Sequence, residues 1–282
     1  MVRVRYVAIG LVLLLACVFL IPVVMTFTGS LISAEGSAGG RRIFPQQPTL
    51  ENYVTVFQYP IVRWFLNSTF VVGGRVIGSL AIATMAAFAV AKYSGRAGRL
   101  AVAAIVITIM TPGVVLMVPK FVVAHRLGMY DSYAGLIVPG LFSAGACWFL
   151  VKFIRAIPDD MVATGRLDGL GAFGLLRHVI VPMAAPALAA LGVLAYASGM
   201  QDFLWPLLMT RSPDKYVLPL GVKLVMYLEW MHVFRGADTP RAKNPGILLA
   251  GAVIALVPSL AVFLAAQKYF IGGLFHKSTG GE

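Results

Sequence analysis

A chain of 282 residues that is 59% hydrophobic and only 12% charged does not have the composition of a soluble domain, in which about a quarter of the residues are charged. Its formal net charge of +12 lies on loops and helix ends without a basic run or a basic-aromatic platform, which argues against nucleic acid and for contact with anionic lipid. Cys17 and Cys147 both lie inside apolar runs, so the sequence predicts neither a disulfide nor a metal site.

Six apolar runs are long enough to cross a bilayer as helices, because an α-helix needs about 20 residues to span a hydrocarbon core of about 30 Å. The first run begins with basic residues, as a signal peptide does. No cleavage site of small residues ends it near residue 20, so we expect it to remain as a membrane helix. The sequence therefore predicts an all-α membrane protein with six transmembrane helices and a single membrane domain over residues 1–282. The predicted spans are residues 6–32, 65–90, 100–118, 133–153, 186–209 and 245–266.

The connection between the fourth and fifth spans, residues 154–185, is unusually long for a membrane protein loop. Pro158 followed by two carboxylates is typical of a helix start, and Asp168-Gly169 is a turn signal. After the turn, apolar residues recur at helical spacing, and this pattern ends before Pro182. The sequence thus predicts two short helices at the membrane surface. The apolar face of the second consists of Phe173, Leu176, Val179 and Ile180.

This connection resembles the cytoplasmic loop of ABC importer permeases, whose pattern is E-A-A, three residues, G, nine residues, I-x-L-P. Gly169 stands at the glycine and residues 179–182 at the I-x-L-P end, whereas Ala163-Thr164-Gly165 replaces E-A-A and lacks the glutamate. The resemblance implies that residues 158–182 form a coupling-helix pair that docks in a groove on an ATP-hydrolysing subunit. An ordinary amphipathic surface loop is the alternative. The candidate coupling residues are Asp159, Asp160, Ala163, Gly165, Arg166, Asp168, Gly169, Phe173 and Pro182.

Further segments resemble the carbohydrate-importing branch of this family, in particular the smaller permease subunit of maltose-type importers, and they stand in the family's order. They are Pro48–Tyr53, Phe65–Ser68, Arg126–Pro139, Gln201–Leu207 and Gln267–Leu274. The usual closing tail, T-A-G-A-V-K-G, is replaced by FHKSTGGE at residues 275–282.

The resemblance implies the ABC importer permease fold of the maltose type, with a cytoplasmic coupling-helix pair and half of a translocation pathway. The implied partners are a second permease subunit, two ATP-binding subunits and an extracytoplasmic solute-binding protein, besides membrane lipid. ATP and Mg would bind the ATPase subunits, and this chain would carry no cofactor. The implied location is the inner membrane of a bacterial or archaeal cell, with both termini cytoplasmic. The distribution of basic residues between the loops does not by itself decide on which side the termini lie.

Arg75 stands inside the second predicted span, about 12 Å from the expected interface at Asn67. A charge at that depth is costly unless it has a partner or water, and Asp202, late in the fifth span beside a break at Pro206, is a candidate counter-ion. A place at the subunit interface or in the solute path and a purely structural ion pair both remain open for Arg75.

The fifth span also carries aromatic and amide side chains close to this break, and such groups bind sugars through C–H faces and hydroxyls. Aromatic residues also commonly line the membrane interface, which is the alternative reading. The substrate-path candidates are Arg75, Tyr196, Gln201, Asp202, Phe203 and Trp205.

The four histidines are scattered, and the sequence has no H-E-x-x-H, G-x-S-x-G or P-loop motif, so we do not expect an enzyme. The function expected from the resemblance is import of a sugar or sugar-like solute. The alternatives are a polytopic membrane enzyme and a permease for a non-sugar solute such as a glycerol-phosphate diester.

Overall fold

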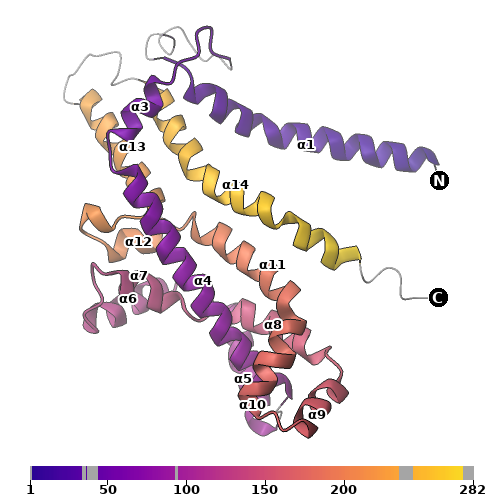
Figure 1. Ribbon diagram of the computed structural model, residues 1–282. Coiled ribbons are helices and arrows are strands. Elements are labelled where there is room, and N and C mark those ends of the chain that lie inside the picture. The colour runs from indigo at the N-terminus through magenta and orange to yellow at the C-terminus, as the bar shows by residue number, and fades with distance from the viewer. Residues whose placement is uncertain (1, 34–35, 37–43, 93–94, 235–243, 276–282) are drawn as a thin grey trace. The chain divides into compact units, whose positions relative to one another are not determined.

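The computed structural model describes residues 2–33, 36, 44–92, 95–234 and 244–275, and these are mostly helical (Figure 1). Their one isolated extended pairing is an antiparallel bridge between Ile32 and Pro48. Four of the described helices are long and apolar enough to cross a membrane, and a fifth candidate is a helix pair bent by 42°. The four are Ile9–Ser30, Ile61–Lys92, Ala172–Gly199 and Pro245–Leu264, and the bent pair is Tyr133–Gly140 with Ala144–Arg155.

Internal contacts divide the chain into two units, one formed by Met1–Trp64 with Leu218–Pro258 and the other by Phe65–Val217 with Ser259–Glu282. The first unit holds α1 (Val2–Ser30), α3 (Glu51–Phe57), the first residues of α4 (Ile61–Lys92), α13 (Leu218–Phe234) and the first part of α14 (Pro245–Phe275). The predicted closing segment Gln267–Leu274 lies in the last turns of α14, and residues 276–282 lie outside the described residues.

The buried amide of Asn52 ties the chain after α1 to the start of α3. Its Nδ2 donates to the carbonyls of Ser30 and Ile32, each at 2.8 Å, and its Oδ1 accepts from Nδ2 of Asn244 at 2.6 Å. Beside it, the hydroxyls of Tyr53 and Ser30 are hydrogen-bonded at 2.7 Å. Because a buried amide without partners is costly, these contacts account for Asn52 and Tyr53 in the Pro48–Tyr53 segment.

Trp64 packs directly on the backbone of α13 and is only 1% exposed. The contact is possible because residue 221 is glycine, since a Cβ at that position would overlap the indole ring. A small residue on one helix therefore makes room for a large one on another.

Gly221→Ala should lower the stability of the protein by about 1–3 kcal/mol, because the added methyl group has to displace a buried indole. The matched control is Gly73→Ala in α4, where a Cβ would meet no atom within 4 Å. Thermal unfolding of the detergent-solubilised protein should show a lower midpoint for the first variant and an unchanged or higher one for the second. Equal midpoints for the two variants would contradict this packing.

The second unit is built around the greater part of α4. Its other helices are α5 (Arg96–Met110), α6 (Met117–Arg126), α7 (Tyr133–Ile137), η1 (Val138–Gly140), α8 (Ala144–Arg155), α9 (Asp159–Leu167), α10 (Ala172–Leu175), η2 (Leu176–Ile180), α11 (Val181–Gly199), α12 (Leu204–Met209) and η3 (Pro213–Lys215).

Small residues let α11 approach α4: a Cβ on Gly192 would lie 3.4 Å from Leu80, and one on Gly199 would lie 2.7 Å from Val72. These contacts hold the two helices side by side.

One apolar core joins the membrane helices of this unit to the connection between α8 and α11. Four side chains of that connection belong to the core, namely Ile157, Val162, Leu175 and Ile180, at 5%, 4%, 1% and 0% exposure. The core residues on the long helices include Ala83, Ala87 and Phe88 of α4, Ile105 of α5, Leu150, Val151 and Ile154 of α8 and Ala187 of α11. In Figure 1, α5, α9 and α10 lie at the same end of α4. The connection is therefore packed into the bundle rather than lying loosely on it.

The third and fourth predicted spans are both interrupted in the structure. The predicted helix over residues 100–118 ends at Met110, because Pro112 favours an extended residue before it and Thr111 has φ −83° and ψ 119°. The fourth is broken between Gly140 and Ala144, where Ser143 caps α8 by accepting a hydrogen bond from the amide of Ala146.

The predicted end of a surface helix before Pro182 is wrong. Residues Ala172–Gly199 form one continuous helix, with a π-helical segment at Leu176–Ile180 directly before Pro182. Since proline has no N–H to donate and its ring crowds the preceding turn, the wider π turn accommodates it without ending the helix. The same helix ends at Gly199, before the break that was predicted at Pro206, and Pro206 lies inside α12.

Candidate functional site

The connection between α8 and α11 starts and turns where the sequence predicts. Pro158 precedes α9 with an extended ψ of 137°, and Asp159 and Asp160 occupy the first turn. Gly169 has a φ of +80°, a conformation that costs residues with a Cβ about 1–2 kcal/mol. Gly165 is buried against Leu175, whose Cδ2 would lie 2.7 Å from an added Cβ. Glycine is thus required at 169 by the backbone and at 165 by close packing.

Asp159 is bound within the chain, by the last residue of α4. Nζ of Lys92 lies 2.6 Å from Oδ1 of Asp159 and donates to the carbonyl of Ile157 at 2.7 Å. This hydrogen bond and the nearby positive charge lower the pKa of Asp159. Lys92 is only 6% exposed, so its ammonium group is held at the α8–α9 junction. Sequence reasoning missed Lys92, although a basic residue ending a long apolar helix was the available signal.

The other predicted coupling residues separate into exposed and buried ones. The exposed set is Asp160, Ala163, Arg166, Asp168, Gly169, Phe173 and Pro182, and Gly165 is buried. The prediction that Phe173 shares the apolar face of Leu176, Val179 and Ile180 is wrong, since it is 71% exposed. Leu175 takes the buried position, because the π segment changes the spacing on which the predicted face depends.

Arg75 and Asp202 form the ion pair that the sequence suggests, with 2.7 Å between Nη1 and Oδ2. Asp202 lies in the break between α11 and α12, where its Oδ1 also accepts a 3.4 Å hydrogen bond from the amide of Trp205. The break brings a carboxylate towards the middle of α4. Both side chains remain about a quarter exposed, at 26% and 23%.

Two cavities flank this ion pair. The first, of about 330 Å³, is lined by both charged residues together with Ser79, Ser143 and Ser198. The second, of about 170 Å³, is lined by both charged residues, Lys120 and Trp205 among others.

The remaining substrate-path candidates do not gather around these cavities. Tyr196, Gln201 and Phe203 line neither of the two. Gln201 is exposed and donates to the carbonyl of Ala197 at 3.4 Å. Trp205 lines the smaller cavity, but its Nε1 donates to the carbonyl of Gly135 at 3.1 Å, which fixes the ring in place. The structure thus brings together Arg75, Asp202 and Trp205 out of the predicted set.

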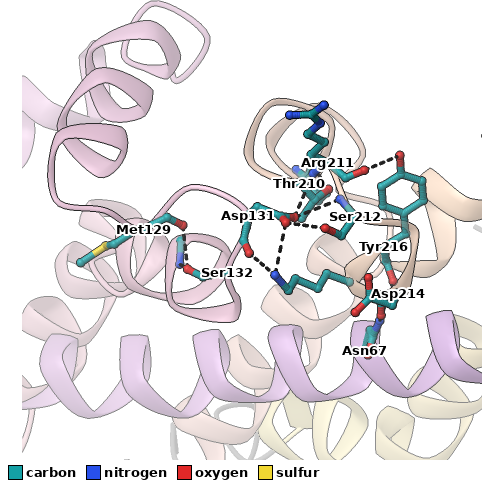
Figure 2. A network of polar contacts seen from close by, with 12 residues as sticks. Asn67, Met129, Asp131, Ser132, Thr210, Arg211, Ser212, Asp214 and Tyr216 are labelled. Atoms are coloured by element: carbon teal, nitrogen blue, oxygen red, sulfur yellow. Dashed lines mark hydrogen bonds and ion pairs between the residues drawn. The ribbon is translucent and has the colours of Figure 1, made fainter.

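At the end of α4 away from α9, Asp131 holds two loops together (Figure 2). Asp131 is a non-glycine residue with φ +52°, and its carboxylate accepts hydrogen bonds from the amides of Arg211 and Ser212 at 3.0 and 3.1 Å. The hydroxyl of Ser212 and Nζ of Lys215 also bind this carboxylate. We call this set of contacts the Asp131 latch. It joins the turn between α6 and α7 to residues 210–217.

Asn67 of α4 fixes the same loop from a second side. Its Nδ2 donates to the carbonyls of Asp214 and Tyr216, each at 2.9 Å, and its Oδ1 accepts from the hydroxyl of Tyr133 at 2.9 Å. Asp131 and Asn67 both lie in segments that carry the family resemblance, but only the folded structure assigns them these partners.

Asp131→Asn should loosen residues 210–217, because asparagine tolerates the positive φ but lacks the charge that strengthens bonds to Lys215 and Ser212. Amide hydrogen exchange at Arg211 and Ser212 should become about tenfold faster, as expected for the loss of about 1.4 kcal/mol. Asp160→Asn, which removes an exposed carboxylate from α9, is the control and should leave these amides unchanged. Unaltered exchange in Asp131→Asn would show that the latch does not hold the loop.

The latch should also be insensitive to pH across the neutral range. The hydrogen bond from Ser212, and those from the two amides and Lys215, hold the pKa of Asp131 well below its usual value. A carboxyl group whose pKa is lower in the folded than in the unfolded chain stabilises the folded state. This stabilisation is fully present above the unfolded pKa of about 3.9, and it is lost only as the pH falls through the lower pKa of the folded state. After correction for intrinsic exchange rates, protection of Arg211 and Ser212 should therefore stay constant between about pH 8 and pH 5.

Comparison with known proteins agrees with this architecture. Residues 79–272 match the family described as binding-protein-dependent transport system inner membrane component. The arabinooligosaccharides transport system permease protein AraQ of Halalkalibacterium halodurans is 30% identical over 232 residues, which cover 82% of this chain and 79% of that protein. The sn-glycerol-3-phosphate transport system permease protein UgpE of Rhizobium meliloti is 29% identical over 262 residues, 90% of this chain and 89% of that one.

The fold is also found in a solved structure. A chain of a bacterial ABC transporter involved in the import of the acidic polysaccharide alginate superposes with a TM-score of 0.81 at 23% identity, over 95% of this chain and 97% of that chain. The family match covers the α8–α11 connection, α4 from Ser79 onward and the ion pair's Asp202. The chain belongs to the family of binding-protein-dependent transport system inner membrane components.

Proposed function

We propose that this chain is the permease subunit of an ATP-driven importer for a sugar or sugar-like solute and forms half of the translocation pathway. The observation that carries the proposal is the family match over residues 79–272, which spans the coupling segment at residues 158–182. Several relatives are themselves named as permeases of arabino-oligosaccharide or glycerol-phosphate transport systems. The partners in this proposal are a second permease subunit, two ATPase subunits that bind ATP and Mg, and an extracytoplasmic solute-binding protein.

The packing of the coupling segment supports its proposed role. Val162, Leu175 and Ile180 are buried in the same core as α4, α8 and α11, so a force on α9 acts on the packed helices as one body. Apolar side chains on the other side of the segment remain available to a partner: Leu167 is 88%, Phe173 71% and Met161 45% exposed. Exposed apolar residues of this kind suit a groove on an ATPase subunit.

The missing glutamate of the E-A-A pattern leaves the contact to be made by other groups. Asp159 is engaged by Lys92 within the chain, so we assign it to positioning α9. The exposed carboxylates of Asp160 and Asp168 are the better candidates for polar contact with the ATPase.

In the proposed topology all six predicted segments cross the membrane and both termini are cytoplasmic. The described helix α5 has only 15 residues, which span about 22 Å, so this crossing needs residues beyond Met110 or a locally thinner bilayer. The coupling segment then faces the cytoplasm, and the Asp131 latch faces outward, where the solute-binding protein would dock.

The relatives leave the solute class open between neutral oligosaccharides and glycerol phosphates, since their identities to this chain are nearly equal. The rival proposal, a polytopic membrane enzyme, is disfavoured because these relatives are named as transport permeases.

A paired labelling experiment tests the topology. The starting point is a chain without its two native cysteines, into which one cysteine is introduced. It replaces either Leu127, which is 64% exposed between α6 and α7, or Leu167, which is 88% exposed at the end of α9. A membrane-impermeant maleimide should label Leu127→Cys only in right-side-out vesicles and Leu167→Cys only in inside-out vesicles. In the same preparations, ATP hydrolysis should require the ATPase subunits and rise with the solute-binding protein. Labelling of position 167 from outside, or hydrolysis by the isolated chain, would defeat the proposal.

Gly169→Ala should uncouple transport from ATP hydrolysis, because a Cβ strains the turn at φ +80° by about 1–2 kcal/mol and shifts α9 relative to α10. Gly171→Ala is the matched control, since φ there is −71° and a Cβ would meet no atom within 4 Å. We expect the ratio of receptor-stimulated to basal ATP hydrolysis to fall in the first variant and to stay near wild type in the second. A normal ratio in both would mean that the geometry of this turn is not used in coupling.

A further inference from the structure

The guanidinium of Arg75 has more donors than partners. It carries five N–H groups, and among the described residues it makes one hydrogen bond, from Nη1 to Asp202 at 2.7 Å. Unsatisfied N–H groups inside a membrane protein are costly unless water or a ligand reaches them. The 26% exposure of the side chain and the two flanking cavities provide that access.

The cavity walls carry a surplus of positive charge. Arg75 and Asp202 line both cavities, and Lys120 of α6 lines the smaller one. No other ionisable side chain is among the lining residues of either cavity, so two cations face one carboxylate. Lys120 is exposed and has no hydrogen-bond or ion-pair partner among the described residues. One negative charge added here would balance the site.

Uncharged polar groups extend the site beyond its charges. Ser79, Ser143 and Ser198 line the larger cavity, and Trp205 lines the smaller one. A volume of about 330 Å³ falls in the range of small-molecule sites. Hydroxyl groups near a spare guanidinium suit a solute that is both hydroxylated and acidic.

Gly140 sets the position of the guanidinium. A Cβ at this residue would lie 2.5 Å from Nε of Arg75 and 3.1 Å from Cζ. An added methyl group would therefore push the flexible end of Arg75 aside without removing its charge.

We infer that Arg75, with Lys120 and Asp202, forms a subsite for the carboxylate or phosphate group of an acidic, hydroxylated solute, such as a uronic acid or a sugar phosphate. The inference rests on the proposed function, since it assigns a solute class to the same pathway. Asp202 restrains Arg75 and, by competing with the solute anion for the guanidinium, keeps binding weak enough for release. A neutral sugar has no group that balances the surplus charge.

The test uses the assembled transporter, with its second permease and ATPase subunits, in nanodiscs of zwitterionic lipid near pH 7. The probes are D-galacturonate and D-galactose, which differ by a carboxylate in place of a hydroxymethyl group, and inorganic phosphate. Equilibrium binding should be about tenfold or more tighter for galacturonate than for galactose, the gain expected of a charge-assisted hydrogen bond. Inorganic phosphate should compete with galacturonate for the subsite. An anionic lipid added to the nanodiscs should not compete, because the proposed anion belongs to a soluble solute and not to a lipid headgroup.

Substitutions separate this subsite from a structural ion pair. Arg75→Gln and Gly140→Ala should each weaken galacturonate binding about tenfold or more, and Lys120→Gln should weaken it less. The control Arg126→Gln, in the same helix as Lys120 but lining neither cavity, should have no effect. Asp202→Asn should strengthen galacturonate binding, a change that loss of a structural pair does not produce.

The double variant Arg75→Gln with Asp202→Asn removes both charges together and guards against misassembly of the single variants. Wild-type galacturonate affinity in this double variant, equal binding of the two sugars, or no binding of galacturonate would each overturn the inference. Stimulation of ATP hydrolysis by the solute-binding protein is measured on the same wild-type preparation. Stimulated ATP hydrolysis without galacturonate binding would refute the subsite alone. A lack of stimulation would refute the proposed function.

Discussion

The constraint on which the second unit depends is that a charged side chain in the middle of a membrane-spanning helix needs a charged partner or water. Arg75 lies near the middle of a helix of 32 residues, about 21 Å from its first residue. Its partner is Asp202, which lies just after the end of α11 at Gly199 and whose Oδ2 is 2.7 Å from Nη1 of Arg75. The ion pair therefore joins α4 to the break between α11 and α12.

The same helix carries the polar anchors of both ends of this unit. At one end Asn67 holds residues 214–216, and the Asp131 latch fixes the same loop to the turn before α7 (Figure 2). At the other end Lys92 holds the junction of α8 and α9. The α4 helix thus links the loop of residues 210–217, a charged pair with cavities, and the proposed site of ATPase contact in one rigid element about 48 Å long.

The two ends differ in the physics that holds them. The loop end relies on charge-assisted hydrogen bonds around Asp131, which are directional and fix the positions of individual backbone amides. The end near α9 adds extensive burial to the contacts of Lys92, with Leu175 and Ile180 almost fully enclosed in a core shared with α4 and α8. A bundle that transmits force needs the second kind of contact, and a loop that presents a fixed surface to a partner needs the first.

The sequence by itself determined the membrane class, the family, the start of α9 at Pro158 and the turn at Gly169, because composition and local backbone preference depend on neighbouring residues alone. It also suggested Asp202 for Arg75, since few carboxylates stand within apolar runs. Only the tertiary structure decided that Phe173 is exposed, that the helix continues through Pro182, and that Lys92 and Asn67 have partners more than 60 residues away. The reason is that these features depend on a π turn and on contacts between distant segments, which a periodic pattern along the chain does not encode.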